Sequence, residues 1–170
     1  GKLRYCFSAA ASMAREIVKQ WKERTGVTIA ESYGMTEVMP TTFNHFYPEF
    51  HVVGSVGPVV HGVEAQIRDV EGNVLPQGHE GEICIRGRNV MKGYLDNPEA
   101  TAAGMWDGEW FRSGDIGVVD ERGYFVIVDR LKDLIITGGE NVYPREVEEA
   151  LYTQPAVEEC AVIGLPDKEW

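Results

Sequence analysis

The sequence predicts an α/β chain with a β-barrel, organised in three parts. A strand, an amphipathic helix and a second strand within residues 1–53 indicate the end of a parallel α/β subdomain. Short alternating strands between turn clusters in residues 54–129 have the spacing of a small antiparallel barrel or sandwich, and we expect a β-barrel subdomain. A charged joint with a hinge at residues 130–132 then leads into residues 133–170, which we expect to be the start of an α+β C-terminal domain.

The first part has the pattern of a βαβ unit. A short buried strand is expected at residues 3–7, and residues 27–30 form the next strand. Ser12 fits the N-cap of the helix between them, and Gly26 fits its C-terminal cap. The apolar face of this helix consists of Met13, Ala14, Ile17, Val18 and Trp21.

Two loops are expected at one edge of this sheet. A βαβ crossover makes its two strands parallel, so the loops that follow them, residues 8–11 and 32–37, open on the same side. Open α/β sheets bind ligands at this edge. A ligand site is therefore predicted in these two loops.

The second part alternates apolar and polar positions in short runs separated by turn residues. Asn97 and Pro98 are expected to cap and begin a short helix among them. Strands are expected at residues 63–67, 83–85, 116–119 and 125–128, with turns at residues 71–73, 77–78 and 120–123.

The third part begins with a charged stretch. Residues 129–133 carry four charges in five positions and cannot be core, because unpaired buried charge is too costly. Residues 138–139 are two glycines that predict a turn. Pro144 begins a helix that Pro155 ends, and residues 160–163 predict a strand. The alternative is that the charged stretch is only a surface hairpin within one domain.

Composition narrows the class of protein. The 170 residues carry a net charge of −11, so no basic nucleic-acid surface is expected. Cys6, Cys84 and Cys160 lie far apart, which argues against zinc and disulfides and favours the cytoplasm. No stretch is apolar enough to span a membrane. The chain begins with Gly1 and a strand follows at once, so we expect a piece of a longer protein.

Residues 33–37 (YGMTE) lie at the predicted ligand edge. The Tyr33 ring can stack on a base, and Gly34 is a flexible residue. The Thr36 hydroxyl can bind a phosphate oxygen, and Glu37 can hold Mg²⁺. The alternative is a polar loop with one half-buried tyrosine.

A second candidate lies at residues 110–115 (WFRSGD). Asp115 follows a glycine turn and could accept hydrogen bonds from two ribose hydroxyls, with Arg130 as a further ribose or phosphate contact. An aspartate that caps a turn and an ordinary surface arginine are the alternatives. No Gly-x-x-x-x-Gly-Lys-Ser/Thr phosphate loop occurs in the chain.

Three motifs in this order resemble the adenylate-forming enzymes, which include acyl-CoA synthetases, nonribosomal peptide adenylation domains and firefly luciferase. They are residues 33–37, residues 110–115 and residues 129–148 (DRLKDLIITGGENVYPREVE), and the resemblance covers essentially the whole chain. The form GGENVYP and residues 93–98 (GYLDNP) look most like the acyl-CoA synthetase branch. The resemblance implies that ATP and a carboxylic acid form an acyl-adenylate with Mg²⁺, and that coenzyme A then accepts the acyl group.

The resemblance also implies roles for single residues. Tyr33 would stack on adenine with Gly34 beside it, Thr36 would contact the α-phosphate, and Glu37 would serve as catalytic Mg²⁺ ligand. The remaining residues would bind adenine (Ala9, Ala10, Ala11), bind ribose (Asp115, Arg130), act as the hinge (Lys132) or line the pantetheine tunnel of coenzyme A (Gly138, Gly139).

This sequence departs from the family pattern in two places. The adenine loop contains three alanines where relatives often have Gly and Pro, and the hinge is Lys132 where many have Asp. The family's Ser/Thr/Gly-rich phosphate loop and catalytic lysine are expected outside residues 1–170, so this segment alone is expected to be inactive.

The favoured interpretation is part of an acyl-CoA synthetase that acts on a fatty or aryl acid, because residues 38–40 are apolar and are expected near the acyl pocket. The alternatives are an adenylation domain that loads a carrier-protein phosphopantetheine, a non-catalytic nucleotide-binding module, and an unrelated β-barrel interaction domain. Glu37, Asp115 and Arg130 retain suitable chemistry, which argues against a lost site.

Overall fold

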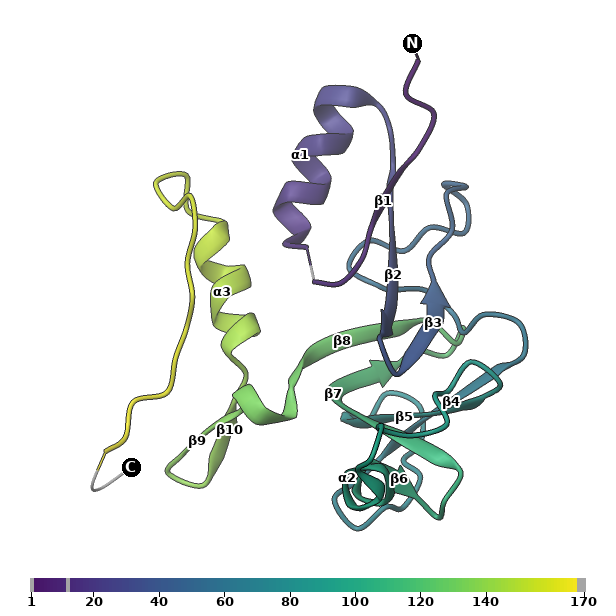
Figure 1. Ribbon diagram of the computed structural model, residues 1–170. Helices are drawn as coiled ribbons and strands as arrows, with labels where there is room; N and C mark the ends of the chain where they lie inside the picture. The colour runs from purple at the N-terminus through teal and green to yellow at the C-terminus, as the bar shows by residue number, and fades with distance from the viewer. Residues whose placement is uncertain (1, 12, 168–170) are drawn as a thin grey trace.

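The computed structural model describes residues 2–11 and 13–167. Its first sheet has the order β1-β2-β3 and contains the expected βαβ unit (Figure 1). Strand β1 (Cys6–Ser8) pairs in parallel with β2 (Ile29–Met35), and helix α1 (Arg15–Thr25) connects them. The predicted parallel pair is therefore confirmed, and β3 (Val38–Phe43) adds an antiparallel strand on the other side of β2.

The ends of helix α1 match the prediction in part. Gly26 adopts a left-handed φ of 71° and donates its backbone N–H to the Lys22 carbonyl at 2.8 Å, as a C-terminal cap should. Val18 is buried, whereas Ile17 is exposed, so the buried face is narrower than predicted. The proposed N-cap, Ser12, lies outside the described residues.

Two predictions for this sheet are wrong. The strand expected at residues 3–7 begins only at Cys6 and is not buried: Phe7 is 55% exposed, because β2 is the only strand that pairs with β1 in the described part of the chain. Residues 32–37 are not one loop. Strand β2 continues through Met35, because β3 supplies hydrogen-bonding partners, and only Thr36 and Glu37 form the turn.

The second sheet contains five antiparallel strands in the order β4-β5-β7-β6, with β8 also paired to β7. They are β4 (Val63–Arg68), β5 (Gly81–Gly87), β6 (Met105–Trp106), β7 (Trp110–Val119) and β8 (Phe125–Arg130). The antiparallel strands are present, but the predicted β-barrel is not closed: among the described strands, β4 forms a ladder with β5 alone, so the sheet stays open. Its core includes Ile67, Ile83, Ile85, Phe111 and Phe125, with Val38 of the first sheet packed into it.

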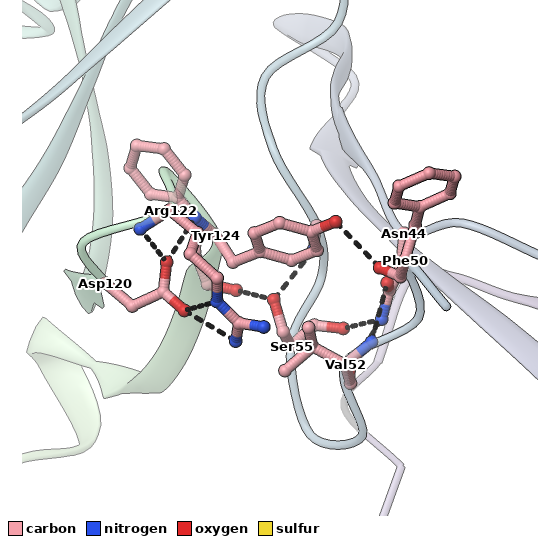
Figure 2. Close-up of polar contacts among 9 residues, drawn as sticks. Asn44, Phe50, Val52, Ser55, Asp120, Arg122 and Tyr124 are labelled. Carbon is pink, nitrogen blue, oxygen red and sulfur yellow. Dashed lines mark hydrogen bonds and ion pairs between the residues drawn. The ribbon is translucent and has the colours of Figure 1, made fainter. Parts of the chain in front are cut away.

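A long connection holds the two sheets together (Figure 2). The buried Asn44 side chain donates to the carbonyls of Val52 and Ser55, both at 2.7 Å. The Ser55 hydroxyl donates to the Phe125 carbonyl at 2.7 Å, and the Tyr124 hydroxyl donates to the Phe50 carbonyl at the same distance. These bonds tie the segment after β3 to the hairpin of β7 and β8.

Helix α2 (Pro98–Ala103) confirms the predicted cap: Asn97 Oδ1 accepts the Ala100 N–H at 3.0 Å. Between β8 and the C-terminal elements lies a short 3₁₀ turn, Leu131–Asp133. Among the described residues, none of the helices is of the length and apolar character that a membrane crossing requires.

The C-terminal elements are β9 (Ile135–Thr137), β10 (Glu140–Val142) and α3 (Pro144–Tyr152). The expected turn at Gly138 and Gly139 is confirmed, since both have positive φ, 59° and 84°. The prediction of a strand at residues 160–163 is wrong, because these residues form no strand in the structure. The Val162 N–H bonds to the Glu148 carboxylate of α3 at 2.8 Å and so takes a side-chain acceptor in place of a neighbouring strand.

Candidate functional site

Three side chains that are far apart in the sequence meet where β2, β7 and β8 come together. The Tyr33 hydroxyl donates a hydrogen bond to Asp115 Oδ2 at 2.7 Å. Arg130 Nε lies 3.9 Å from Asp115 Oδ1, and Arg130 is paired opposite Asp115 in the ladder of β7 and β8. The structure thus unites one aromatic ring, one carboxylate and one guanidinium, as the sequence analysis expected for a nucleoside-binding group.

A local irregularity in β7 aims Asp115 at Tyr33. Arg112 of β7 pairs with Cys84 of β5, and Ile116 pairs with Glu82, so four steps along β7 lie opposite two steps along β5. Gly114, within this stretch, has a positive φ of 70°. The predicted glycine turn is therefore a bulge inside a strand. Glu82 of β5 holds this bulge: its carboxylate accepts from the Gly114 N–H at 3.1 Å and from Arg112 Nε at 3.0 Å.

Ser113 completes the support of Asp115. Its hydroxyl oxygen accepts the Asp115 N–H at 3.0 Å. Sequence reasoning missed Glu82 altogether. The only available signal was an acidic residue at the start of a predicted strand, and only the register of β5 and β7 shows why it matters.

The electrostatics keep Tyr33 a donor. Burial raises the pKa of Tyr33, and the nearby Asp115 charge raises it further, so the phenol stays protonated. Burial also raises the pKa of Asp115, whose side chain is 16% exposed, while the Tyr33 hydrogen bond and the Arg130 charge oppose that rise. Asp115 is a partly desolvated acceptor with a cation beside it, which suits it to bind vicinal hydroxyls.

Thr36 and Glu37 lie at the turn between β2 and β3. Thr36 is exposed, and one carboxylate oxygen of Glu37, Oε1, accepts from the Tyr94 hydroxyl at 2.8 Å. Gly34 lets the two strands approach, since a Cβ atom at this position would lie 3.0 Å from the Val38 carbonyl oxygen. Its role in the structure is thus close packing of the hairpin.

The donor set at this turn fits a magnesium ion that is shared with phosphate. Glu37 Oε2 has no hydrogen-bond partner in the described part of the chain. The described residues contain no group of three or more His, Cys, Asp or Glu side chains that could hold a metal by themselves. Mg²⁺ in nucleotide sites is commonly held by one or two carboxylates plus substrate phosphates, so a single free carboxylate oxygen agrees with that mode.

The other predicted residues are placed as follows. Ala9, Ala10 and Ala11 follow the end of β1 and are exposed, and Ala10 has a positive φ of 75°. Because Ser8 pairs with Glu31, this loop begins beside the part of β2 that leads to Tyr33. Lys132 is exposed in the 3₁₀ turn. Gly138 and Gly139 lie in the hairpin of β9 and β10, which Figure 1 shows well away from β2, so they are not brought to Tyr33.

Comparison with known proteins identifies the family. Residues 1–95 match the model of the AMP-binding enzyme family, and residues 146–170 match that of the AMP-binding enzyme C-terminal domain. The chain belongs to the AMP-binding enzyme family. The resemblance to the adenylate-forming enzymes is therefore confirmed at the level of the family, and residues 1–95 include the motif at residues 33–37.

Members of the AMP-binding family that resemble this chain include a feruloyl-CoA synthase of Amycolatopsis sp, 44% identical over 99% of this chain and 34% of the relative. A long-chain-fatty-acid–CoA ligase of Bacillus subtilis is 43% identical over 97% of this chain and 30% of the relative. ATP-bound MatB from Rhodopseudomonas palustris superimposes with a TM-score of 0.91 at 43% identity and covers 95% of this chain and 32% of its own. The chain thus spans about a third of the length of these relatives.

Proposed function

We propose that the protein containing this chain is an AMP-forming acid–thiol ligase. It joins a carboxylic acid to AMP from ATP, releases pyrophosphate, and transfers the acyl group to the thiol of coenzyme A. The observation that carries this proposal is that the side chains of Tyr33, Asp115 and Arg130 meet. Glu37 lies in the turn between β2, the strand of Tyr33, and β3. Relatives named as CoA ligases and an ATP-bound neighbour support the same chemistry.

Each group has a proposed task in the first half-reaction. The ring of Tyr33 stacks on adenine beside Gly34 and the loop Ala9–Ala11, and Asp115 accepts the ribose hydroxyls with Arg130 beside it. Thr36 would donate to the α-phosphate, and Glu37 would ligate Mg²⁺ when it is bound. When bound, Mg²⁺ would offset the negative charge of the phosphates.

The second half-reaction requires a change of orientation after the adenylate forms. Lys132 is exposed in the 3₁₀ turn between β8 and β9, and hinges commonly lie in connecting segments of this kind. We propose residues 130–132 as the hinge, and residues 1–53, 54–129 and 133–170 as the parts of the chain on either side of it. Rotation there would carry Gly138 and Gly139, which lie in the next hairpin, to the pantetheine path.

We propose an apolar acid, either fatty or aryl, as the substrate. Of the apolar residues at 38–40, Val38 is fully buried in the core and cannot contact a substrate, whereas Met39 is 66% exposed and can. The names of the relatives refer to acids as different as ferulate, long-chain fatty acids and oxalate, so the comparisons do not favour one class of acid for this protein.

We also propose a cytoplasmic location. The three cysteines are free, which agrees with a reducing compartment: Cys6, Cys84 and Cys160.

Pyrophosphate exchange in the full-length protein tests this function. A panel of fatty, aryl and short dicarboxylic acids is offered with ATP and Mg²⁺, and thioester formation is then measured with free coenzyme A. Acid-dependent exchange followed by acyl-CoA is the expected result. Exchange without acyl-CoA, but with transfer to a phosphopantetheine carrier, would favour a carrier-loading domain. Absence of exchange with every acid would contradict the ligase proposal and favour a non-catalytic nucleotide-binding module.

A further inference from the structure

Glu37 has a partner that comes from a distant part of the chain. The Tyr94 hydroxyl donates to Glu37 Oε1 at 2.8 Å, across 57 positions of sequence. Because this bond uses one oxygen of the carboxylate, it restricts rotation of the Glu37 side chain and leaves Oε2 without a partner among the described residues.

The same segment also binds the backbone of Glu37. The Met91 N–H donates to the Glu37 carbonyl oxygen at 2.7 Å, and Val90 forms an antiparallel bridge with Val38. Residues 90–94 therefore hold Glu37 at two points, its main chain and its carboxylate. A side chain held in this way has less conformational entropy to lose when it binds a ligand.

Tyr94 is itself fixed by the first turn of α2. Its N–H donates to Thr101 Oγ1 at 2.9 Å, and the Thr101 hydroxyl donates to the Asn97 carbonyl at 2.9 Å. Gly93 makes this fit possible, because a Cβ atom there would lie 2.9 Å from a Thr101 methyl group and the backbone φ is 151°. The backbone of Tyr94 is thus held by α2, while its side chain is 40% exposed and its hydroxyl is held by Glu37.

The protonation state suits a donor. A tyrosine hydroxyl has an ordinary pKa of about 10, so it can donate a hydrogen bond at neutral pH. A tyrosine is suited to this task because it can reach across the surface with only two side-chain torsions to fix.

We propose that Tyr94 is a positioning residue for metal binding by Glu37. It orients the carboxylate so that Oε2 is free for the Mg²⁺ of bound ATP. This inference rests on the proposed function, in which Glu37 is the protein's metal ligand. It adds a residue that acts through Glu37, from a segment that the nucleotide motifs do not include. Partners that orient metal ligands typically change metal affinity by about 10–100-fold when they are removed.

Two matched variants of the full-length protein test this role. Tyr94→Phe removes the hydroxyl and keeps the ring. Tyr124→Phe is the control, because it removes a tyrosine hydrogen bond of similar length, to the Phe50 carbonyl, in the connection shown in Figure 2. Mn²⁺ binding is titrated by electron paramagnetic resonance in the presence of a non-hydrolysable ATP analogue, and the Mg²⁺ dependence of pyrophosphate exchange is measured in parallel.

Tyr94→Phe should weaken Mn²⁺ binding about tenfold, the lower end of that range, and raise the half-saturating Mg²⁺ concentration, while Tyr124→Phe should leave both unchanged. The double variant Tyr94→Phe/Glu37→Gln should bind Mn²⁺ no more weakly than Glu37→Gln alone, because Tyr94 acts through Glu37. Wild-type Mn²⁺ affinity in Tyr94→Phe, or a full additional loss in the Glu37→Gln background, would overturn the inference. Absence of exchange in the wild type would instead overturn the proposed function, and the Mn²⁺ titrations would still decide the role of Tyr94.

Discussion

Replacing Asp115 with asparagine separates its charge from its structural contacts. The side-chain amide of the Asp115→Asn variant would still offer an oxygen to the Tyr33 hydroxyl, which now donates to Asp115 at 2.7 Å, so that buried donor keeps an acceptor. The lost ion pair with Arg130 is long, 3.9 Å, and Arg130 is 56% exposed, so we expect it to cost only about 0–1 kcal/mol of stability. The substitution should therefore leave the free energy of unfolding nearly unchanged.

Nucleotide binding should respond much more strongly. A hydrogen bond to a charged group contributes about 1.5–3 kcal/mol, which corresponds to roughly one to two powers of ten in affinity. Asp115→Asn should raise the KM for ATP by this factor while the KM for the acid changes little, as measured by pyrophosphate exchange in the full-length protein. Asp115→Ala is the companion variant: it also leaves the Tyr33 hydroxyl unpaired and should lower stability by about a further 1–3 kcal/mol. An unchanged ATP dependence in Asp115→Asn would refute the ribose assignment.

Three further predictions concern the same site. Glu37→Gln should reduce adenylation strongly with little change in melting temperature, and a large loss of stability with normal activity would argue for a structural role. Because burial raises the pKa of Asp115, nucleotide affinity should begin to fall at a higher pH than it would with an ordinary aspartate as the solution is acidified. The same raised pKa means that the folded protein takes up this proton before the unfolded chain does, so the contribution of Asp115 to the free energy of unfolding rises as pH falls. Over this pH range, nucleotide affinity should therefore decrease while the contribution of Asp115 to stability increases. Lys132→Pro should impair thioester formation more than adenylate formation, because proline fixes φ in the 3₁₀ turn. Equal loss of both half-reactions would contradict the assignment of Lys132 as the hinge.

Local chemistry allowed much of the fold to be predicted. The Gly26 cap and the Asn97 cap follow from residues that act within a few positions of themselves, and the parallel pair of β1 and β2 follows from the order strand, helix, strand. The hairpin of β2 and β3 was missed because its turn, Thr36-Glu37, contains neither Gly nor Asn and gives no turn signal.

Features that depend on distant pairing could not be predicted. The open edge of β4 depends on which strands pair, and strand patterns alone do not distinguish an open sheet from a closed barrel. The motifs identified Tyr33, Asp115 and Arg130 as candidates, but their contacts required the register of β7 against β5 and β8. Glu82 binds the Gly114 N–H, which is 32 positions away, and Tyr94 binds Glu37, which is 57 positions away. No local pattern marks Glu82, and the GYLDNP pattern at residues 93–98 gave no sign of the contact between Tyr94 and Glu37.

A crystal structure of the full-length protein with AMP or an acyl-adenylate would test the central claim most directly. The nucleoside should lie where β2, β7 and β8 meet. Both ribose hydroxyls should be within hydrogen-bonding distance of the Asp115 carboxylate, and the adenine should lie against the Tyr33 ring. A nucleotide bound elsewhere, with Tyr33, Asp115 and Arg130 bonded only to one another, would contradict the assignment of this group as the nucleotide site.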